Sequence, residues 1–449
     1  MKSKTAFLWD ESFIWGLMAY EALKKNNLTF ELIRSEDIKQ KGLNNYSMLF
    51  VPGGWASNKL KALGDEGIAE IKRFVKNGGN YLGLCGGAGL ATMDGIGLLG
   101  IKRKPTKDRV PSFSGRISLS INKHEIWEGL DNVDNKIFHA WWPSQFVVQD
   151  KKVKILATYG EPMPDAFSSD LCIGDVIKSG QDWTELESIY KINLNPTKLI
   201  GEPAVVEGTY GEGRIILSLI HFDTPEDTAG HTVLKDIWKY FLGEVADTYK
   251  LTNEKIASSN KSNNFNNKNT SSKNEKVGHS IISSEQDLII SELFDATKDL
   301  ISFGERNFLW FQRNSMLFQW RRGVRGLEYC NLYMLIRKIQ EILNLDNKNI
   351  SDSIENFNLR LHIIRETFLP FYGNSKKLLL MERLAMQNGH ITYEKCDEQL
   401  IQSLRLELFS ASKSYGGMYK RLIDDIDRLL FDLIQNIERS DLMPYLIQR

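Results

Sequence analysis

One cysteine in this sequence stands where a catalytic nucleophile would be expected. Residues 80–91 read NYLGLCGGAGLA, so Cys85 follows a short apolar run and lies between Gly83 and Gly87. A nucleophile elbow is a tight strand-to-helix turn that exposes one reactive side chain, and it needs small residues two positions before and after the nucleophile. The alternative is a structural thiol packed among glycines. The spacing favours the nucleophile.

Backbone amides near this turn are candidates for stabilising an oxyanion. Gly86 would begin the helix after the elbow, where its N–H can point at a substrate and the helix N-terminus favours a thiolate. A second donor is expected from residues 51–58, VPGGWASN, in which Gly53 and Gly54 follow another apolar run. Because glycine lets the backbone approach a substrate closely, we predict all three glycines as oxyanion or substrate-binding residues.

A general base for the cysteine is predicted further along the chain. His221 ends the apolar run in GEGRIILSLIH, and the carboxylates of Asp223 and Glu226 follow it. A His-x-acid pair places both side chains on one side of an extended segment, where the acid can orient the imidazole. Either acid could do so, although an acid after a strand is also commonly a solvated cap. The predicted catalytic set is Cys85, His221, Asp223 and Glu226.

The surrounding pattern predicts an α/β domain over residues 1–249. Apolar runs such as TAFLW, YSMLFVPGG and NYLGL alternate with amphipathic stretches such as DEGIAEIKRFVKNGG. This alternation indicates a parallel sheet covered by helices on both faces, and functional residues of such sheets gather at the carboxyl ends of the strands. Further strand-like runs fill residues 112–220. Among them, FHAWWPSQF at 138–146 is interpreted as buried strand aromatics rather than as the lining of a cleft.

The chain changes character after this domain. Residues 250–284 are mostly Asn, Ser and Lys in their central part, which predicts a flexible linker. Residues 285–449 show apolar side chains at spacings of three and four, which predicts a helical bundle. We expect this bundle to bind a protein partner or a second copy of the chain. The basic segment 313–325, RNSMLFQWRRGVR, is interpreted as an exposed helix face rather than an anion site.

The composition argues against several classes of binding partner. Lys plus Arg equals Asp plus Glu, 57 against 57, so neither nucleic acid nor an anionic membrane is expected as a partner. The four cysteines form no CxxC pair, which gives no reason to expect a zinc site, another metal, a cofactor or a disulfide framework. No apolar stretch approaches the roughly 20 residues of a membrane helix, and the first residues do not resemble a signal peptide. A cytoplasmic location is expected.

The motifs resemble the class I glutamine amidotransferase superfamily. In particular they are similar to the amidotransferase-like domain at the N-terminus of eukaryotic biotin-protein ligases, over residues 4–246, through VPGGW, GLCGGAGLA and GEGRIILSLIHFDTPE. The resemblance implies a flavodoxin-like fold, with Cys85 as nucleophile and His221 as base. It does not imply biotin ligase activity, because RRGVRGLEY at 321–329 matches the ligase loop only superficially.

Two departures from the superfamily pattern leave two functions open. The usual third catalytic residue is Glu, whereas the matching position here is Asp223, and Gly86 replaces the His that is common in the protease and deglycase branch. One function is a cysteine-dependent amidohydrolase: Cys85 attacks a small amide, His221 shuttles the proton, and water or an acceptor resolves the thioester. The other is a catalytically silent module that senses a small metabolite.

Overall fold

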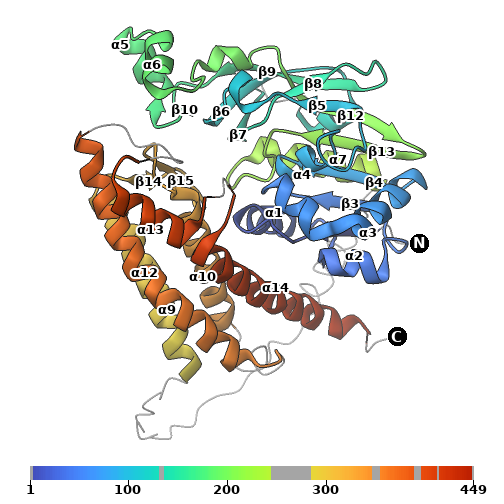
Figure 1. Ribbon diagram of the computed structural model, residues 1–449. Helices are drawn as coiled ribbons and strands as arrows, with labels where there is room; N and C mark the ends of the chain where they lie inside the picture. Colours follow the sequence, from blue (N-terminus) through green and yellow to red (C-terminus); the bar gives the residue numbers. More distant parts are fainter. Residues whose placement is uncertain are drawn as a thin grey trace, which may run out of the picture.

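The computed structural model describes residues 4–130, 136–243, 285–345, 354–388, 396–411 and 414–446. The predicted linker at 250–284 lies outside these residues. The predicted boundaries of the two domains therefore stay predictions. Figure 1 shows an α/β region and a mainly helical region lying side by side.

Five parallel strands form one half of the main sheet. Their order is β2-β1-β3-β4-β13, which is the order of a flavodoxin-like doubly wound sheet. The sequences of these strands are short apolar runs because helices cover both faces of the sheet. The predicted fold class is confirmed. The five strands are β1 (Thr5–Leu8), β2 (Glu31–Ile33), β3 (Met48–Val51), β4 (Asn80–Leu84) and β13 (Gly213–Ser218).

Helices connect these strands and begin at the edge where the strands end. Each β-to-α turn therefore brings its residues to the same edge of the sheet, which is where α/β proteins place their sites. The helix after β3 bends at Gly64, whose φ of 58° lies in the left-handed region. The helices are α1 (Ile14–Lys25), α2 (Ser35–Lys41), α3 (Ala56–Lys76), α4 (Gly86–Leu90) and α7 (Thr228–Leu242).

The other half of the sheet is antiparallel. It continues from β13 in the order β12-β9-β6-β10-β11, and β7 pairs with β6. The strands are β6 (Phe113–Ile121), β7 (Ile137–Trp141), β9 (Lys154–Pro162), β10 (Phe167–Ser168), β11 (Leu171–Cys172) and β12 (Pro203–Tyr210). A separate two-stranded ladder pairs β5 (Ile101–Arg103) with β8 (Phe146–Val148). Two short helices are α5 (Ile173–Ser179) and α6 (Trp183–Tyr190). Three 3₁₀ turns are η1 (Thr106–Asp108), η2 (Glu125–Leu130) and η3 (Pro196–Leu199).

The rest of the described chain is mainly helical, as predicted. The helices are α9 (Glu285–Arg306), α10 (Gly326–Leu345), α12 (Phe357–Asn388), α13 (Gln399–Phe409) and α14 (Gly417–Leu446). The basic segment 313–325 was expected on a helix face, and this expectation is wrong. It belongs to a two-stranded hairpin of β14 (Trp310–Gln312) and β15 (Phe318–Trp320). Alternating aromatic and polar residues favour this pairing.

The helical region packs directly on the α/β region. Buried apolar residues of both regions belong to one continuous core. In Figure 1, α14 runs beside α1, and the indole nitrogen of Trp9 donates to Oδ1 of Asp427 on α14 at 2.8 Å. Asn331 of α10 accepts from the backbone N–H of Ile14 at 3.2 Å.

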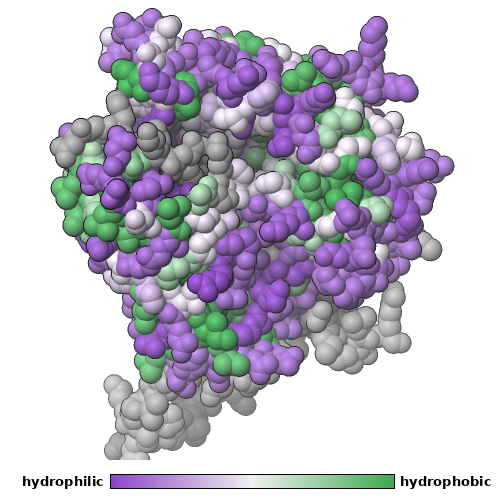
Figure 2. Space-filling model, in the orientation of Figure 1, coloured by the Kyte–Doolittle hydropathy of each residue, from purple (hydrophilic) through white to green (hydrophobic). Residues whose placement is uncertain are grey.

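The surface is polar, in contrast to the apolar core. The face in Figure 2 is mostly hydrophilic, with separate hydrophobic patches. In the part of the chain that the structure describes, no helix is long and apolar enough to cross a membrane.

Candidate active site

Cys85 occupies a sharp turn between β4 and α4. Its backbone has φ 48° and ψ −103°, a conformation that non-glycine residues rarely adopt and that marks strained functional turns. The glycines on either side are required by space, because a Cβ on Gly83 would lie 2.6 Å from the carbonyl oxygen of Gly87, and one on Gly87 would overlap that of Val51. The thiol is half-buried. This is the geometry of the predicted elbow.

The loop after β3 lies against this elbow. The N–H of Gly87 donates to the carbonyl oxygen of Pro52 at 3.1 Å, and a Cβ on Gly86 would overlap the backbone of Gly54. Gly54 itself has φ 115°, which favours glycine. As the first residue of α4, Gly86 has no partner for its N–H within the helix. The two predicted glycine segments therefore form one backbone surface beside Cys85.

His221 reaches the same place from the end of β13. A Cβ on Gly53 would lie 3.1 Å from Cε1 of its ring, and Nδ1 lies 2.9 Å from Oδ1 of Asp223. Both the imidazole and the carboxylate are fully buried. Nε2, the other ring nitrogen, makes no hydrogen bond of ordinary length among the described residues, and Cys85 is the side chain that interacts with the ring besides Asp223. One nitrogen is therefore oriented by an acid, and the other is left for Cys85 or a reacting group.

The charges around His221 favour its protonated form. Burial alone would lower the pKa of the imidazole, but Asp223 and Cys85 outweigh burial and raise the pKa to about 10. At neutral pH His221 is thus protonated and can give a proton from its ring to a leaving group.

The two candidate acids differ in position. Asp223 is buried against the imidazole, so the shorter side chain reaches His221 directly. Glu226 is exposed, has φ 63°, and makes no hydrogen bond with His221 in the described part of the chain. The structure thus brings together Cys85, His221 and Asp223, and leaves Glu226 at the surface.

A buried lysine near the cysteine was not predicted. Nζ of Lys59 donates to the backbone oxygen of Asp10 at 2.9 Å and to Oγ of Ser12. Burial lowers its pKa to about 8, against the opposing charges of Glu11, Asp10, Asp427 and Cys85. No local pattern indicates this burial, because a lysine in the first turn of an amphipathic helix ordinarily faces solvent.

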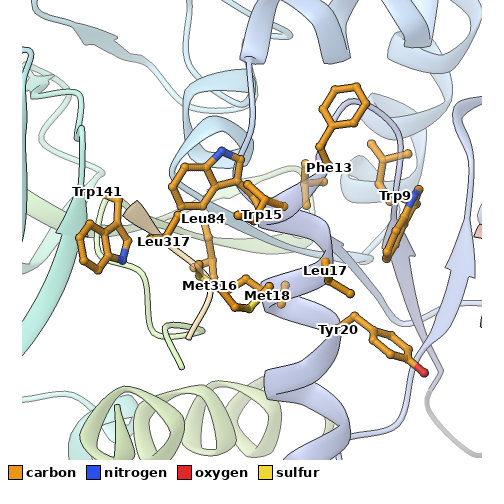
Figure 3. Close-up of a cluster of buried hydrophobic side chains, with 14 of the residues drawn as sticks. Trp9, Phe13, Trp15, Leu17, Met18, Tyr20, Leu84, Trp141, Met316 and Leu317 are labelled. Carbon is orange, nitrogen blue, oxygen red and sulfur yellow. The ribbon is translucent and has the colours of Figure 1, made fainter. Parts of the chain in front are cut away.

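Aromatic rings cover the imidazole. Trp15 lies with its ring centroid 4.8 Å from that of His221, and Trp142 meets Trp15 at 6.1 Å. Trp142 has φ 48° and stacks on Trp320 of the β14–β15 hairpin at 4.7 Å. Figure 3 shows Leu317, from the turn of this hairpin, close to Leu84 and Trp15. The helical region therefore contributes side chains to the surroundings of the elbow.

No metal centre is evident at this site or elsewhere in the described residues. Groups of three or more His, Cys, Asp or Glu side chains placed to hold an ion are absent from that part of the chain.

One protein family matches part of this region. The family model for the N-terminal domain of biotin-protein ligase matches residues 22–94. The match confirms the predicted resemblance for this segment, which includes the loop of Gly53 and Gly54 and the elbow at Cys85. It ends well before His221.

Other comparisons give partial similarities. The chain is 28% identical over 123 residues to cobyric acid synthase of Prochlorococcus marinus, and the match spans 23% of each protein. PurLQS from Thermotoga maritima superimposes with a TM-score of 0.37 and 15% identity, over 54% of this chain and 99% of that one. A glutamine amidotransferase from the same organism gives a TM-score of 0.33 and 14% identity, over 57% and 86% of the two chains.

Proposed function

We propose that the α/β region is a cysteine-dependent amidohydrolase of the glutamine amidotransferase type. Its substrate would be a small amide, Cys85 its nucleophile, and His221 its acid and base, oriented by Asp223. The observation that carries this proposal is the joint geometry of the strained elbow and the buried imidazole, which Asp223 holds at one nitrogen and which interacts with Cys85.

In the first half of this reaction the Cys85 thiolate attacks the amide carbon, and a C–S bond forms. The electron pair of the C=O bond moves to oxygen, where the N–H groups of Gly86 and Gly54 would donate to it. The His221 imidazolium then gives the proton on Nε2 to the amide nitrogen. The C–N bond breaks, ammonia leaves, and a thioester remains.

In the second half, water resolves the thioester. Neutral His221 takes a proton from water, and the resulting hydroxide attacks the thioester carbon. The C–S bond breaks and releases the carboxylic acid, while the thiolate and imidazolium are restored. Asp223 holds the imidazole in place and stabilises its charge throughout, because its carboxylate bonds to Nδ1.

Ammonia release from a panel of small amides tests this proposal. The full chain should release ammonia from at least one amide, and Cys85→Ala and His221→Ala should each reduce the rate by about 10³-fold or more. Cys172→Ala is a matched control, since Cys172 is also half-buried and lies outside this site. Equal rates in wild type and Cys85→Ala would refute the enzyme.

One observation favours the second function, a silent module that binds a metabolite. A series of ring contacts connects the imidazole to the helical region through Trp15, Trp142 and Trp320. Through these contacts, ligand binding near His221 could change the packing of the helical region. Such a module would bind an amide and protect Cys85 from alkylation without releasing ammonia.

The helical region remains our candidate for association with a second copy of the chain. Exposed apolar side chains occur in i,i+4 pairs on α12, at Leu359 and Ile363 and at Leu380 and Leu384. Sedimentation velocity should show a dimer that dissociates in a Leu359→Glu, Leu384→Glu variant. A monomer at all concentrations would reject this role.

A further inference from the structure

Lys59, on the first turn of α3, has a buried ammonium group that the proposed reaction does not use. Its side chain is fully buried. Nζ donates to the backbone oxygen of Asp10 at 2.9 Å and also donates to Oγ of Ser12. Burial of a charge is unfavourable unless hydrogen bonds or an opposite charge compensate it. The contacts of this ammonium group therefore indicate what it does.

The two carboxylates on the turn after β1 bind other groups. Oδ1 of Asp10 lies 2.7 Å from Nη1 of Arg34. Oε1 of Glu11 accepts from Nζ of Lys420 at 2.9 Å. The charges of both acids favour the ammonium form of Lys59, but its hydrogen bonds go to a backbone oxygen and a hydroxyl oxygen. These hydrogen bonds hold the turn itself.

The turn that Lys59 holds is strained. Glu11 has φ 55° and Phe13 has φ 48°, values that non-glycine residues rarely adopt. Strained backbone persists only where the surrounding contacts determine it. The two hydrogen bonds of Lys59 reach the residues on either side of Glu11, namely Asp10 and Ser12. The ammonium group thus fixes the position of the backbone at Glu11.

Glu11 and Lys59 together lie against Gly54. A Cβ on Gly54 would overlap the backbone oxygen of Glu11 and would lie 3.3 Å from Cε of Lys59. On its other side, the backbone of Gly54 lies so close to Gly86 that a Cβ there would overlap it. Gly54 is therefore enclosed between the turn that Lys59 holds and the residue that follows Cys85.

The N–H groups of both glycines are available to a ligand. Neither Gly54 nor Gly86 donates its N–H to another group in the described part of the chain. Two such N–H groups beside a nucleophile can bind the oxygen of a carbonyl under attack, provided that they are held in place. We propose that Lys59 is a positioning residue: it holds the turn that packs on Gly54 and so keeps the Gly54 N–H in place beside Cys85. This inference rests on the proposed function.

Two reactions of Cys85 distinguish positioning from a general structural role. Ammonia release passes through an oxyanion, whereas alkylation by iodoacetamide displaces iodide and forms no oxyanion. Lys59→Met keeps the apolar stem and removes the ammonium group. It should lower kcat for ammonia release at least about tenfold and leave KM within about twofold, because the lost contact acts in the transition state. The alkylation rate at its alkaline plateau, where the thiol is fully ionised, should stay within about twofold of wild type.

A small aldehyde tests the same role without turnover. When the Cys85 thiolate adds to the carbonyl carbon of butyraldehyde, a C–S bond forms and the C=O electron pair moves to oxygen, which takes a proton from the His221 ring. This adduct blocks alkylation, and its oxygen needs the same N–H donors as the oxyanion. The butyraldehyde concentration that halves the alkylation rate should therefore rise at least about tenfold in Lys59→Met.

Lys61→Met is the matched control, since Lys61 lies two residues further along α3 and is exposed. It should leave kcat and the protection by butyraldehyde unchanged. Lys59→Arg, which restores a charged donor, should recover part of the lost kcat. Ser12→Ala removes one of the two acceptors of the ammonium group and should weaken the protection by a smaller factor. It tests the same contact if Lys59→Met does not fold.

Two results with Lys59→Met would overturn the inference. One is the same kcat and the same protection by butyraldehyde as in wild type. The other is an equal loss of alkylation at the alkaline plateau, which would mean a general structural role. A wild-type chain that neither releases ammonia nor is protected by butyraldehyde would overturn it as well. If the protection depends on Lys59 but no amide releases ammonia, the role of Lys59 stands and the proposed hydrolase fails.

Discussion

Both regions of this protein bury charged side chains, but they do so differently. In the helical region Arg325 lies 3.0 Å from Glu328, and Arg405 lies 2.7 Å from Glu382. At the edge of the α/β sheet, Arg109 has no acid among the described residues. Nε2 of His221 and the hydroxyl of Tyr159 also make no hydrogen bond of ordinary length there.

The difference indicates what each group of charges does. A buried ion pair holds its elements in one arrangement, and its removal from one side leaves an unpaired charge. A buried donor or cation without a partner destabilises the protein in the absence of ligand. Such groups are found at functional sites, where a bound ligand supplies the missing partner. The helical charges are therefore structural, whereas we propose that those at the strand ends belong to a binding site.

The largest effect on stability is expected in the helical region. Glu382→Ala removes the carboxylate that pairs with the buried guanidinium of Arg405 and should lower the free energy of unfolding by about 3–5 kcal/mol. Glu292→Ala breaks a half-exposed pair with Arg365 in the same region and should cost less than about 1 kcal/mol. Denaturant unfolding measures both. Equal losses would show that the buried pair holds the helices no more strongly than an exposed one, and the structural role of the buried charges would fail.

A second effect concerns the pH dependence of stability. Because folding raises the pKa of His221 from 6.5 to about 10, its protonation stabilises the fold fully below pH 6.5, and this contribution is lost as the pH rises through about 10. Asp223→Asn removes the main favourable charge. The variant should show a lower His221 pKa by NMR titration and a smaller fall in unfolding free energy over this range. An unchanged pKa would show that Asp223 does not govern the base.

The smallest effect is expected at the sheet edge. Arg109→Met keeps the apolar stem and removes an unpaired cation, so the free energy of unfolding should stay within about 1 kcal/mol of wild type. The Glu382→Ala variant is the comparison in the same assay. A loss of several kcal/mol in Arg109→Met would mean that this arginine is structural, and the distinction between the two regions would fail.

Local sequence patterns were enough to predict the fold of the α/β region and the spatial proximity of three of its segments. The elbow glycines, the loop at Gly53 and the histidine after a strand are each readable because parallel strands bring their carboxyl ends to one edge. The choice between Asp223 and Glu226 was not readable, since both spacings allow contact with the imidazole. The structure brings only Asp223 to it.

Lys59 had no local pattern to reveal its burial. Its ammonium group is buried because tertiary packing brings α3 against the turn after β1, where Nζ donates to the backbone oxygen of Asp10. The β14–β15 hairpin was missed for a related reason. Its basic residues read as a solvated helix face, whereas Arg313 lies over the ring of Phe167 at 4.5 Å, a contact between regions.

The relative reactivity of the cysteines tests the central claim most directly. Iodoacetamide labelling at pH 7, followed by peptide mass spectrometry, compares Cys85 with Cys172, which is equally half-buried. Cys85 should react at least about tenfold faster than Cys172. Cys330, whose pKa burial raises to about 12, should react slowest. His221→Ala should remove the advantage of Cys85. If Cys85 reacts no faster than Cys172, and His221→Ala changes nothing, the glycines surround a structural thiol and the proposed active site is wrong.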